Sequence, residues 1–214
     1  HYSTEFMAAL LTNEINNTDR IVRFVNDCRQ MGIELLPPCV NESVGGFIVR
    51  ERSIRFGLSG IKNVGTAAIN SIIKCRNQDG EFTSLLDFCE RVEQSAVNSK
   101  VMECLVRAGA MDCFGRKRAE LLALLPEAQE RASGIQRDRN AGQTSLFEAV
   151  PIEKVQDLPH LEVEELPKSE LLKAEKQLLG VYLSGHPLWE YKKELELFAS
   201  MTTAEIAGEE EVSA

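Results

Sequence analysis

The sequence has no long hydrophobic run, few aromatic residues and no closely spaced pair of cysteines. Its 214 residues contain no apolar stretch near the ~20 residues that a bilayer crossing needs, which excludes a membrane-spanning helix. Aromatic residues make up 6% of the chain, so we expect a core of mainly Leu, Ile, Val and Ala. The 43% hydrophobic and 27% charged residues are typical of a globular protein, neither disordered nor collagen-like.

The cysteines and histidines suggest no reactive centre. No two of the six cysteines are separated by only two residues, which excludes a zinc knuckle and a thioredoxin-type motif. We expect reduced thiols, with Cys89 and Cys104 buried on apolar helix faces. His160 has no partner nearby in the sequence, and His186, before a proline, is expected to cap helix carbonyls. We therefore predict no catalytic residue and no metal ligand.

The charge is unevenly distributed. The 24 Lys and Arg residues face 33 Asp and Glu residues, a net charge of −9 that argues against a nucleic-acid partner for the chain as a whole. Basic residues nevertheless dominate Arg50–Arg76 and Arg107–Arg118, whereas Glu148–Leu172 is acidic. Because salt screens charges beyond ~8–10 Å, a phosphate responds mainly to the nearest patch. Binding to DNA therefore remains possible for the middle of the chain.

The hydrophobic pattern predicts a mainly α-helical fold with one small β-hairpin. The hairpin is expected from residues 47–49 and 53–56 around a charged tip. Phe6, Leu10 and Ile15 are the expected apolar anchors of the first helix. We expect a mobile polar stretch over 134–142 and an acidic, proline-containing segment over 148–167. The predicted helices cover residues 5–15, 18–31, 66–76, 84–92, 98–108, 116–132, 169–182 and 190–198, with Asn17 or Thr18, Ser84 and Asn98 as N-caps.

A glycine-punctuated segment can hold a phosphate. A short helical turn, a reversal and a new helix would expose backbone amides beside a mobile positive charge. The pattern resembles the hairpin of a helix-hairpin-helix DNA-binding motif, with Asn63 where the family's first glycine stands. The alternative is a plain connection between helices, without a ligand. The candidate DNA-binding residues are Gly60, Lys62, Asn63, Val64, Gly65 and Thr66, and in a weaker second hairpin Gly109 and Ala110.

A short motif, Gln143-Thr144-Ser145-Leu146-Phe147, lies between polar and acidic residues. Either Leu146 and Phe147 dock on the domain itself, or they fill an apolar pocket of a partner while Gln143 bonds at its rim. The pentapeptide resembles the consensus by which bacterial proteins bind the β sliding clamp. In that interpretation Gln143, Ser145, Leu146 and Phe147 form the clamp-binding site.

Several stretches in fixed order resemble the C-terminal half of the bacterial DNA polymerase III alpha subunit family. They are Glu5–Thr12, Cys28–Ile33, Leu36–Ser43, Ile54–Leu58, Ile61–Gly65, Phe88–Val92, Ala108–Ala110 and Leu183–Leu188. The resemblance implies that the chain is part of a longer, replicative DNA polymerase of the bacterial cytoplasm, associated with the nucleoid.

The resemblance also implies an order of parts. Residues 1–40 would end the fingers domain, 41–133 would form a tandem helix-hairpin-helix domain that holds duplex primer-template DNA, and 134–167 a flexible linker with the clamp motif. Residues 168–200 would lead to an OB-fold region starting within 201–214. The implied partners are DNA, the β sliding clamp and other subunits of the polymerase III holoenzyme.

Catalysis in this family depends on palm-domain aspartates and Mg²⁺, for which this sequence offers no Asp-x-Asp pair. We therefore expect no cofactor and no polymerase activity from this chain alone. Two alternatives are a lesion-bypass paralogue of the alpha subunit and a helical interaction scaffold without a DNA role. The clamp motif favours the replicative form over the paralogue.

Overall fold

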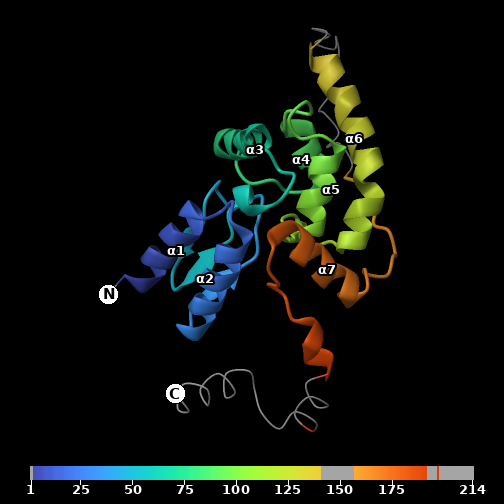
Figure 1. Ribbon diagram of the computed structural model, residues 1–214. Helices are drawn as coiled ribbons and strands as arrows, with labels where there is room; N and C mark the ends of the chain where they lie inside the picture. Colours follow the sequence, from blue (N-terminus) through green and yellow to red (C-terminus); the bar gives the residue numbers. More distant parts are fainter. Residues whose placement is uncertain (1, 141–156, 192–196, 198–214) are drawn as a thin grey trace, which may run out of the picture. The chain divides into compact units, whose positions relative to one another are not determined.

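A computed structural model describes residues 2–140, 157–191 and 197 (Figure 1). The chain divides into two compact units, His1–Leu183 and Ser184–Ala214; the described part of the second contains the 3-10 helix η3 (Pro187–Tyr191). The first unit is mainly helical, as predicted. Its α-helices are α1 (Ser3–Asn13), α2 (Thr18–Gln30), α3 (Thr66–Asp79), α4 (Leu85–Arg91), α5 (Ser99–Arg107), α6 (Arg118–Asn140) and α7 (Lys168–Leu179).

Three helix starts follow directly from local chemistry. The side chain of Asn17 accepts a hydrogen bond from the Arg20 amide at 3.3 Å, at the start of α2. Ser84 does the same for α4, and Asn98 for α5. A side-chain oxygen at this position satisfies an amide that the first helical turn leaves free. The predicted caps Ser84 and Asn98 are therefore confirmed, and of the alternatives Asn17 and Thr18 it is Asn17 that caps α2.

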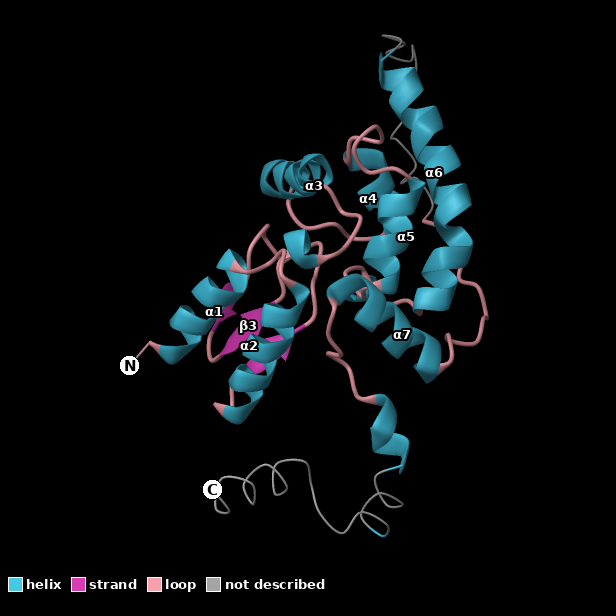
Figure 2. Cartoon of the chain, viewed as in Figure 1, coloured by secondary structure: helices cyan, strands magenta, loops and turns pink. Residues whose placement is uncertain are grey.

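The predicted β-hairpin is present, and a third strand joins it. β2 (Ile48–Arg50) pairs antiparallel with β3 (Ser53–Arg55). β1 (Glu34–Leu36), which the sequence pattern did not predict, pairs parallel with β3, so the strand order is β1-β3-β2. Helices α1 and α2 pack on this sheet (Figure 2).

The predicted anchors of α1 are partly wrong. Phe6 is 62% exposed, whereas Met7 and Leu11 are buried in the core. The helix begins at Ser3, two residues earlier than predicted. Leu10 and Ile15 are partly buried against the core, as expected. The core therefore packs against a face of α1 that lies next to the predicted one.

A close backbone crossing fixes the segment that precedes the predicted DNA-binding hairpin. A Cβ on Gly57 would lie 2.5 Å from the carbonyl oxygens of Gly45 and Gly46. The amide of Leu58 donates to the carbonyl of Val44 at 2.8 Å. Only glycine allows these backbones to approach so closely. The crossing therefore sets the position of the 3-10 helix η1 (Leu58–Gly60).

Helix α6 packs against α4 and α5 and is longer than predicted. Residues 134–140 continue the helix, so the prediction of a mobile stretch is wrong for them. The Gln136 side chain donates to the carbonyls of Glu90 at 3.0 Å and Val92 at 3.2 Å, at the end of α4. This contact between distant parts of the chain anchors a stretch that has no apolar pattern of its own.

Residues 157–167 lie against the start of α6. Leu158 is only 3% exposed and belongs to the hydrophobic core. Arg116 donates to the carbonyls of Leu158 at 2.8 Å and Pro159 at 2.9 Å, and pairs with Asp157 at 3.3 Å. The prediction of a flexible linker is therefore wrong for 157–167, because Leu158 joins the core while Asp157 and two backbone carbonyls bind Arg116, just before α6.

His160 also has a partner that the sequence does not indicate. Its Nδ1 lies 2.9 Å from the buried carboxylate of Glu120, which also accepts hydrogen bonds from the Leu161 amide and the Arg116 guanidinium. Burial raises the pKa of Glu120, but the Leu161 hydrogen bond and the charges of His160 and Arg116 outweigh it and hold the pKa below its usual value. The buried carboxylate is thus ionised at neutral pH.

The carboxylate of Glu165 caps α6. Its two oxygens accept hydrogen bonds from the amides of Arg118 and Ala119, each at 3.0 Å. Burial raises the pKa of Glu165, but these amides and the charge of Arg118 lower it below its usual value overall. An anion therefore already occupies the positive end of this helix.

We expect Gly57→Ala to lower the free energy of unfolding by about 1–3 kcal/mol, because the added methyl overlaps two carbonyl oxygens. Gly134→Ala is the matched control: a Cβ there meets no atom within 4 Å, and alanine should stabilise the helix by about 0.5–1 kcal/mol. Chemical denaturation of both variants measures the difference. Equal stability of the two variants would contradict the crossing.

We expect Glu165→Gln to destabilise the chain by about 0.5–1 kcal/mol at pH 7, because the cap loses its charge. The folded pKa lies below the unfolded value of about 4.3, so this stabilisation is complete above that value and is lost as the pH falls through the folded pKa. Thermal unfolding from pH 7 to pH 3 should therefore show the two proteins converging in acid. The neighbouring exposed Glu164→Gln is the control, and a difference independent of pH would exclude the charged cap.

Candidate nucleic-acid interface

The predicted hairpin forms the turn between η1 and α3. Ile61 and Val64 are buried, at 1% and 7% exposure, and fix the turn to the core. Between them Lys62 and Asn63 are exposed. Asn63 adopts the left-handed conformation, with φ of 68°, which asparagine tolerates better than most residues. The turn thus presents polar residues between two buried anchors.

Backbone amides at the start of α3 are open. The amide of Val64 donates to the Ile61 carbonyl at 3.2 Å and closes the turn. Those of Gly65 and Thr66 donate no hydrogen bond within the described part of the chain, and both residues are exposed. Amides at a helix start carry positive partial charge and favour an anion. Val64 therefore positions the turn, while Gly65 and Thr66 offer the donors.

The two glycines of the first hairpin have different roles. A Cβ on Gly60 would lie 2.6 Å from the ring of Phe56, so this glycine is required for packing. A Cβ on Gly65 would meet no atom within 4 Å, and its φ is −77°. The space beside Gly65 is therefore open to a group from outside the described chain, which is the condition for close approach of a phosphate.

Helix α7 and helix α5 support the turn through contacts that the sequence does not indicate. The amide of Lys62 donates to the carbonyl of Leu178, in the last turn of α7, at 2.9 Å. The Asn63 side-chain amide lies 3.8 Å from the sulfur of Cys104 on α5. These partners are 116 and 41 residues away along the chain, so no local pattern could have identified them.

The second predicted hairpin offers no free amide at its glycine. The amides of Gly109 and Ala110 donate to the carbonyls of Val106 and Leu105, both at 2.9 Å, and close the end of α5. Gly109 has a φ of 81°, and a Cβ there would lie 2.3 Å from the Arg118 guanidinium. DNA contact by Gly109 and Ala110 remains a prediction.

The basic cluster at the start of α6 is bound by the chain itself. Arg116 contacts the 157–167 segment, and Lys117 donates to the Val163 carbonyl at 2.9 Å. Arg118 pairs with Asp112 at 2.7 Å. These charges are therefore largely neutralised from within.

The cations around the first hairpin are partly used inside the fold as well. Arg55 pairs with Glu42 at 2.8 Å, and Arg76 donates to two backbone carbonyls at 2.9 Å. The positive charges of this region that are exposed are Arg50, Arg52, Lys62 and Lys74. The excess of basic residues in the sequence of Arg50–Arg76 thus overestimates the positive charge that is available to a ligand.

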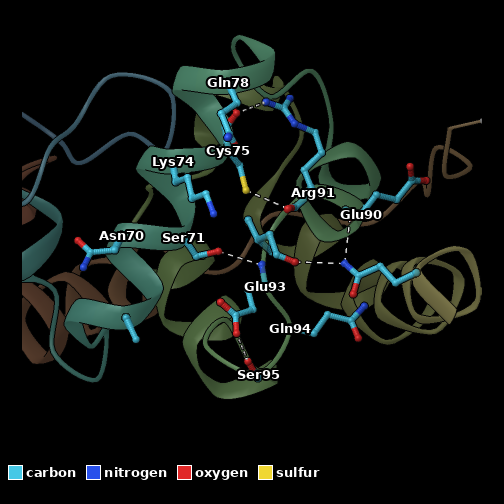
Figure 3. A pocket seen from close by; sticks show the side chains of 13 residues that line it. Asn70, Ser71, Lys74, Cys75, Gln78, Glu90, Arg91, Glu93, Gln94 and Ser95 are labelled. Carbon is cyan, nitrogen blue, oxygen red and sulfur yellow. Dashed lines mark hydrogen bonds between the residues drawn. The ribbon is translucent and has the colours of Figure 1, made fainter. Parts of the chain in front are cut away.

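A cavity of about 770 Å³ lies between α3 and the segment that follows α4. The hydroxyl of Ser71 accepts from the Glu93 amide at 2.9 Å, and the Cys75 thiol donates to the Arg91 carbonyl at 2.9 Å (Figure 3). These polar groups join the elements on the two sides of the cavity. In the lining the Ser95 hydroxyl also donates to the carboxylate of Glu93 at 2.6 Å, and both of these residues are exposed to solvent.

The cysteines and the histidine that the sequence analysis singled out make packing and backbone contacts. Cys89 and Cys104 are buried, as predicted, and burial raises the pKa of Cys89 to about 12. In the second unit, His186 Nδ1 accepts from the Leu188 amide at 3.2 Å, so the expectation that it caps carbonyls is wrong for that nitrogen. The residues proposed for clamp binding, Gln143 and Ser145–Phe147, lie outside the described residues.

Neither a metal centre nor a membrane helix is found within residues 2–140 and 157–191. No group of three or more His, Cys, Asp and Glu side chains there is placed to hold a metal ion, so these residues do not fit the metal-binding aspartates of a polymerase palm. No described helix is both long and apolar enough to cross a membrane.

Comparison with known proteins agrees with this geometry. The helix-hairpin-helix motif family matches residues 32–121, which include the turn before α3. The chain is 41% identical over 200 residues to the DNA polymerase III alpha subunit of Neisseria meningitidis serogroup B, and 41% over 195 residues to that of Bacillus subtilis. It is 39% identical over 198 residues to the same subunit of Xylella fastidiosa.

These matches cover 91–93% of the chain but only 17% of each relative. The chain therefore spans less than a fifth of the length of the curated relatives it matches. The similarity extends through both the hairpin region and the residues after it. Along nearly its whole length the chain is thus similar to one segment of bacterial DNA polymerase III alpha subunits.

Proposed function

We propose that this chain grips the backbone of duplex DNA within a replicative DNA polymerase and tethers that enzyme to a sliding clamp. The observation that carries the DNA part is the pair of open amides of Gly65 and Thr66, exposed beside Lys62 at the start of α3. The match to the helix-hairpin-helix family over 32–121 supports it.

The chemistry of this site suits a phosphate better than a base. Two amides and a lysine provide donors and positive charge, which complement phosphate oxygens. The Lys62 ammonium is a flexible point charge and the Asn63 amide is turned to Cys104, so neither side chain presents the paired donor and acceptor that read a base edge. Binding should therefore depend little on DNA sequence and weaken steeply with salt.

The net charge of −9 does not oppose this function. The acidic residues Asp157 and Glu165 are bound at the start of α6, where Asp157 pairs with Arg116 and Glu165 caps the backbone amides. The exposed cations near the first hairpin retain their charge at the surface. Because screening limits interactions to about 8–10 Å, the local charge determines how a phosphate binds.

For the tether, we propose that Leu146 and Phe147 fill an apolar pocket of the β sliding clamp, with Gln143 and Ser145 bonding at its rim. The support is the resemblance of this pentapeptide to the clamp-binding consensus. Burial of the two side chains would supply about 3–6 kcal/mol before ordering costs. A weak contact of this kind still raises the local concentration of the polymerase at the primer end.

The polymerase reaction itself is assigned to other parts of the longer enzyme, with Mg²⁺ held by its palm aspartates. The relatives are named as DNA polymerase III alpha subunits, which favours the replicative enzyme over a lesion-bypass paralogue. We place the enzyme in the bacterial cytoplasm, on nucleoid DNA, with other holoenzyme subunits as partners. A helical scaffold without DNA binding is the competing function.

We expect Lys62→Glu combined with Gly65→Asp to weaken duplex binding about tenfold or more, because negative charge meets the phosphate at the open amides. Fluorescence anisotropy with labelled duplexes of several sequences, over a salt series, measures this. Arg23→Glu, an exposed cation of α2, is the control and should leave binding unchanged. Salt-insensitive or absent binding by the unaltered chain would favour the scaffold.

We expect Leu146→Ala with Phe147→Ala to abolish capture of the chain on immobilised β clamp while leaving duplex affinity intact, because the apolar contact is lost. Thr144→Ala, within the same peptide but outside the proposed contact, should be captured like the unaltered chain. If the double variant and the control bind the clamp equally well, Leu146 and Phe147 do not form the clamp contact.

A further inference from the structure

A second hollow opens beside the hairpin, between the turn, α5 and α7. Its volume is about 530 Å³. We call it the α5–α7 groove. Its lining includes Lys62 and Asn63 of the turn, Lys100, Glu103 and Arg107 of α5, and Lys173 of α7.

The groove is positively charged although the chain is acidic. Four cations line it, against the carboxylates of Glu103 and Glu170. Glu103 pairs with Lys100 at 3.0 Å and with Arg107 at 2.8 Å. Hydrogen bonds from these two partners hold the pKa of Glu103 below its usual value, so this carboxylate offsets one of the two charges at neutral pH.

Lys62 and Lys173 carry the positive charge that is not used inside the fold. Both are exposed, and neither side chain makes a hydrogen bond or ion pair within residues 2–140 and 157–191. Two unpaired ammonium groups on one hollow repel each other. Their placement is favourable where an anion lies between them.

The groove is continuous with the open amides of α3. Lys62 belongs to both the hairpin turn and the groove, because it precedes Gly65 in the turn and its side chain also lines the groove. The bond from the Lys62 amide to the Leu178 carbonyl holds α7 against the turn. Asn63, which stands where the motif has glycine, contacts Cys104 on the groove wall. The turn, α5 and α7 therefore present one joined surface.

We propose that the α5–α7 groove binds the sugar-phosphate backbone of the same duplex, next to the phosphate held by the α3 amides. This inference rests on the proposed function. It makes α7 part of the DNA-binding surface, with Lys173 as a backbone contact, although the sequence suggests only a connection to a following domain. A polyanion fits this surface because its successive charges can meet Lys62 and Lys173 in turn.

The test is a salt series of duplex binding by the 214-residue chain and its variants, with anisotropy of a labelled duplex of random sequence. We expect Lys173→Gln to weaken binding about three- to tenfold at low salt and to reduce the slope of log affinity against log salt by about 0.9, the loss of one phosphate contact. Gln177→Glu, which adds a negative charge to the groove lining, should also weaken binding. Lys168→Gln, on the exposed first turn of the same helix, is the matched control and should change neither quantity.

The outcomes separate the two proposals. If Lys173→Gln and Gln177→Glu bind like the Lys168→Gln control while the hairpin variant loses affinity, the groove is not a DNA site and the hairpin function stands. If the unaltered chain binds no duplex at all, both proposals are wrong. A lower salt slope for Lys173→Gln alone, with an unchanged circular dichroism melt, supports the groove.

Discussion

The open amides of Gly65 and Thr66, at the start of α3, are the feature that the surrounding structure holds in place for a ligand. Amides at a helix start that face water cost the fold little free energy, because water accepts their hydrogen bonds. The same amides form a binding site for an anion. The surrounding structure keeps the amides of Gly65 and Thr66 in place and accessible. Burial of Ile61 and Val64, the backbone crossing at Gly57 and the bond to α7 all fix the turn that presents them.

Helices α3 and α6 both begin with backbone amides that attract an anion, but they differ in whether an acidic side chain of the described chain binds there. At α6 the carboxylate of Glu165 accepts two backbone hydrogen bonds, and the 157–167 segment covers the basic cluster. At α3 no acidic group of the described chain takes that place. The acidic segment thus does not oppose DNA binding by the first hairpin, because it acts on another helix, where it stabilises the fold.

Local chemistry was predictable from the sequence, and contacts between distant segments were not. The caps Asn17, Ser84 and Asn98, the β2–β3 hairpin and the turn before α3 follow from neighbouring residues. Strand β1 has three residues and depends on parallel pairing with β3, which no local pattern signals. For the candidate site, the hairpin residues were predicted, but the supports from Leu178 and Cys104 come from elements far along the chain.

The most direct test is a titration of the ¹⁵N-labelled chain with short duplex DNA at low salt, followed by amide chemical shifts in NMR spectra. We expect the Gly65 and Thr66 signals to move most, and added salt to return them to their free positions. Movement elsewhere while these two amides stay unchanged would contradict the claim that the start of α3 receives a phosphate.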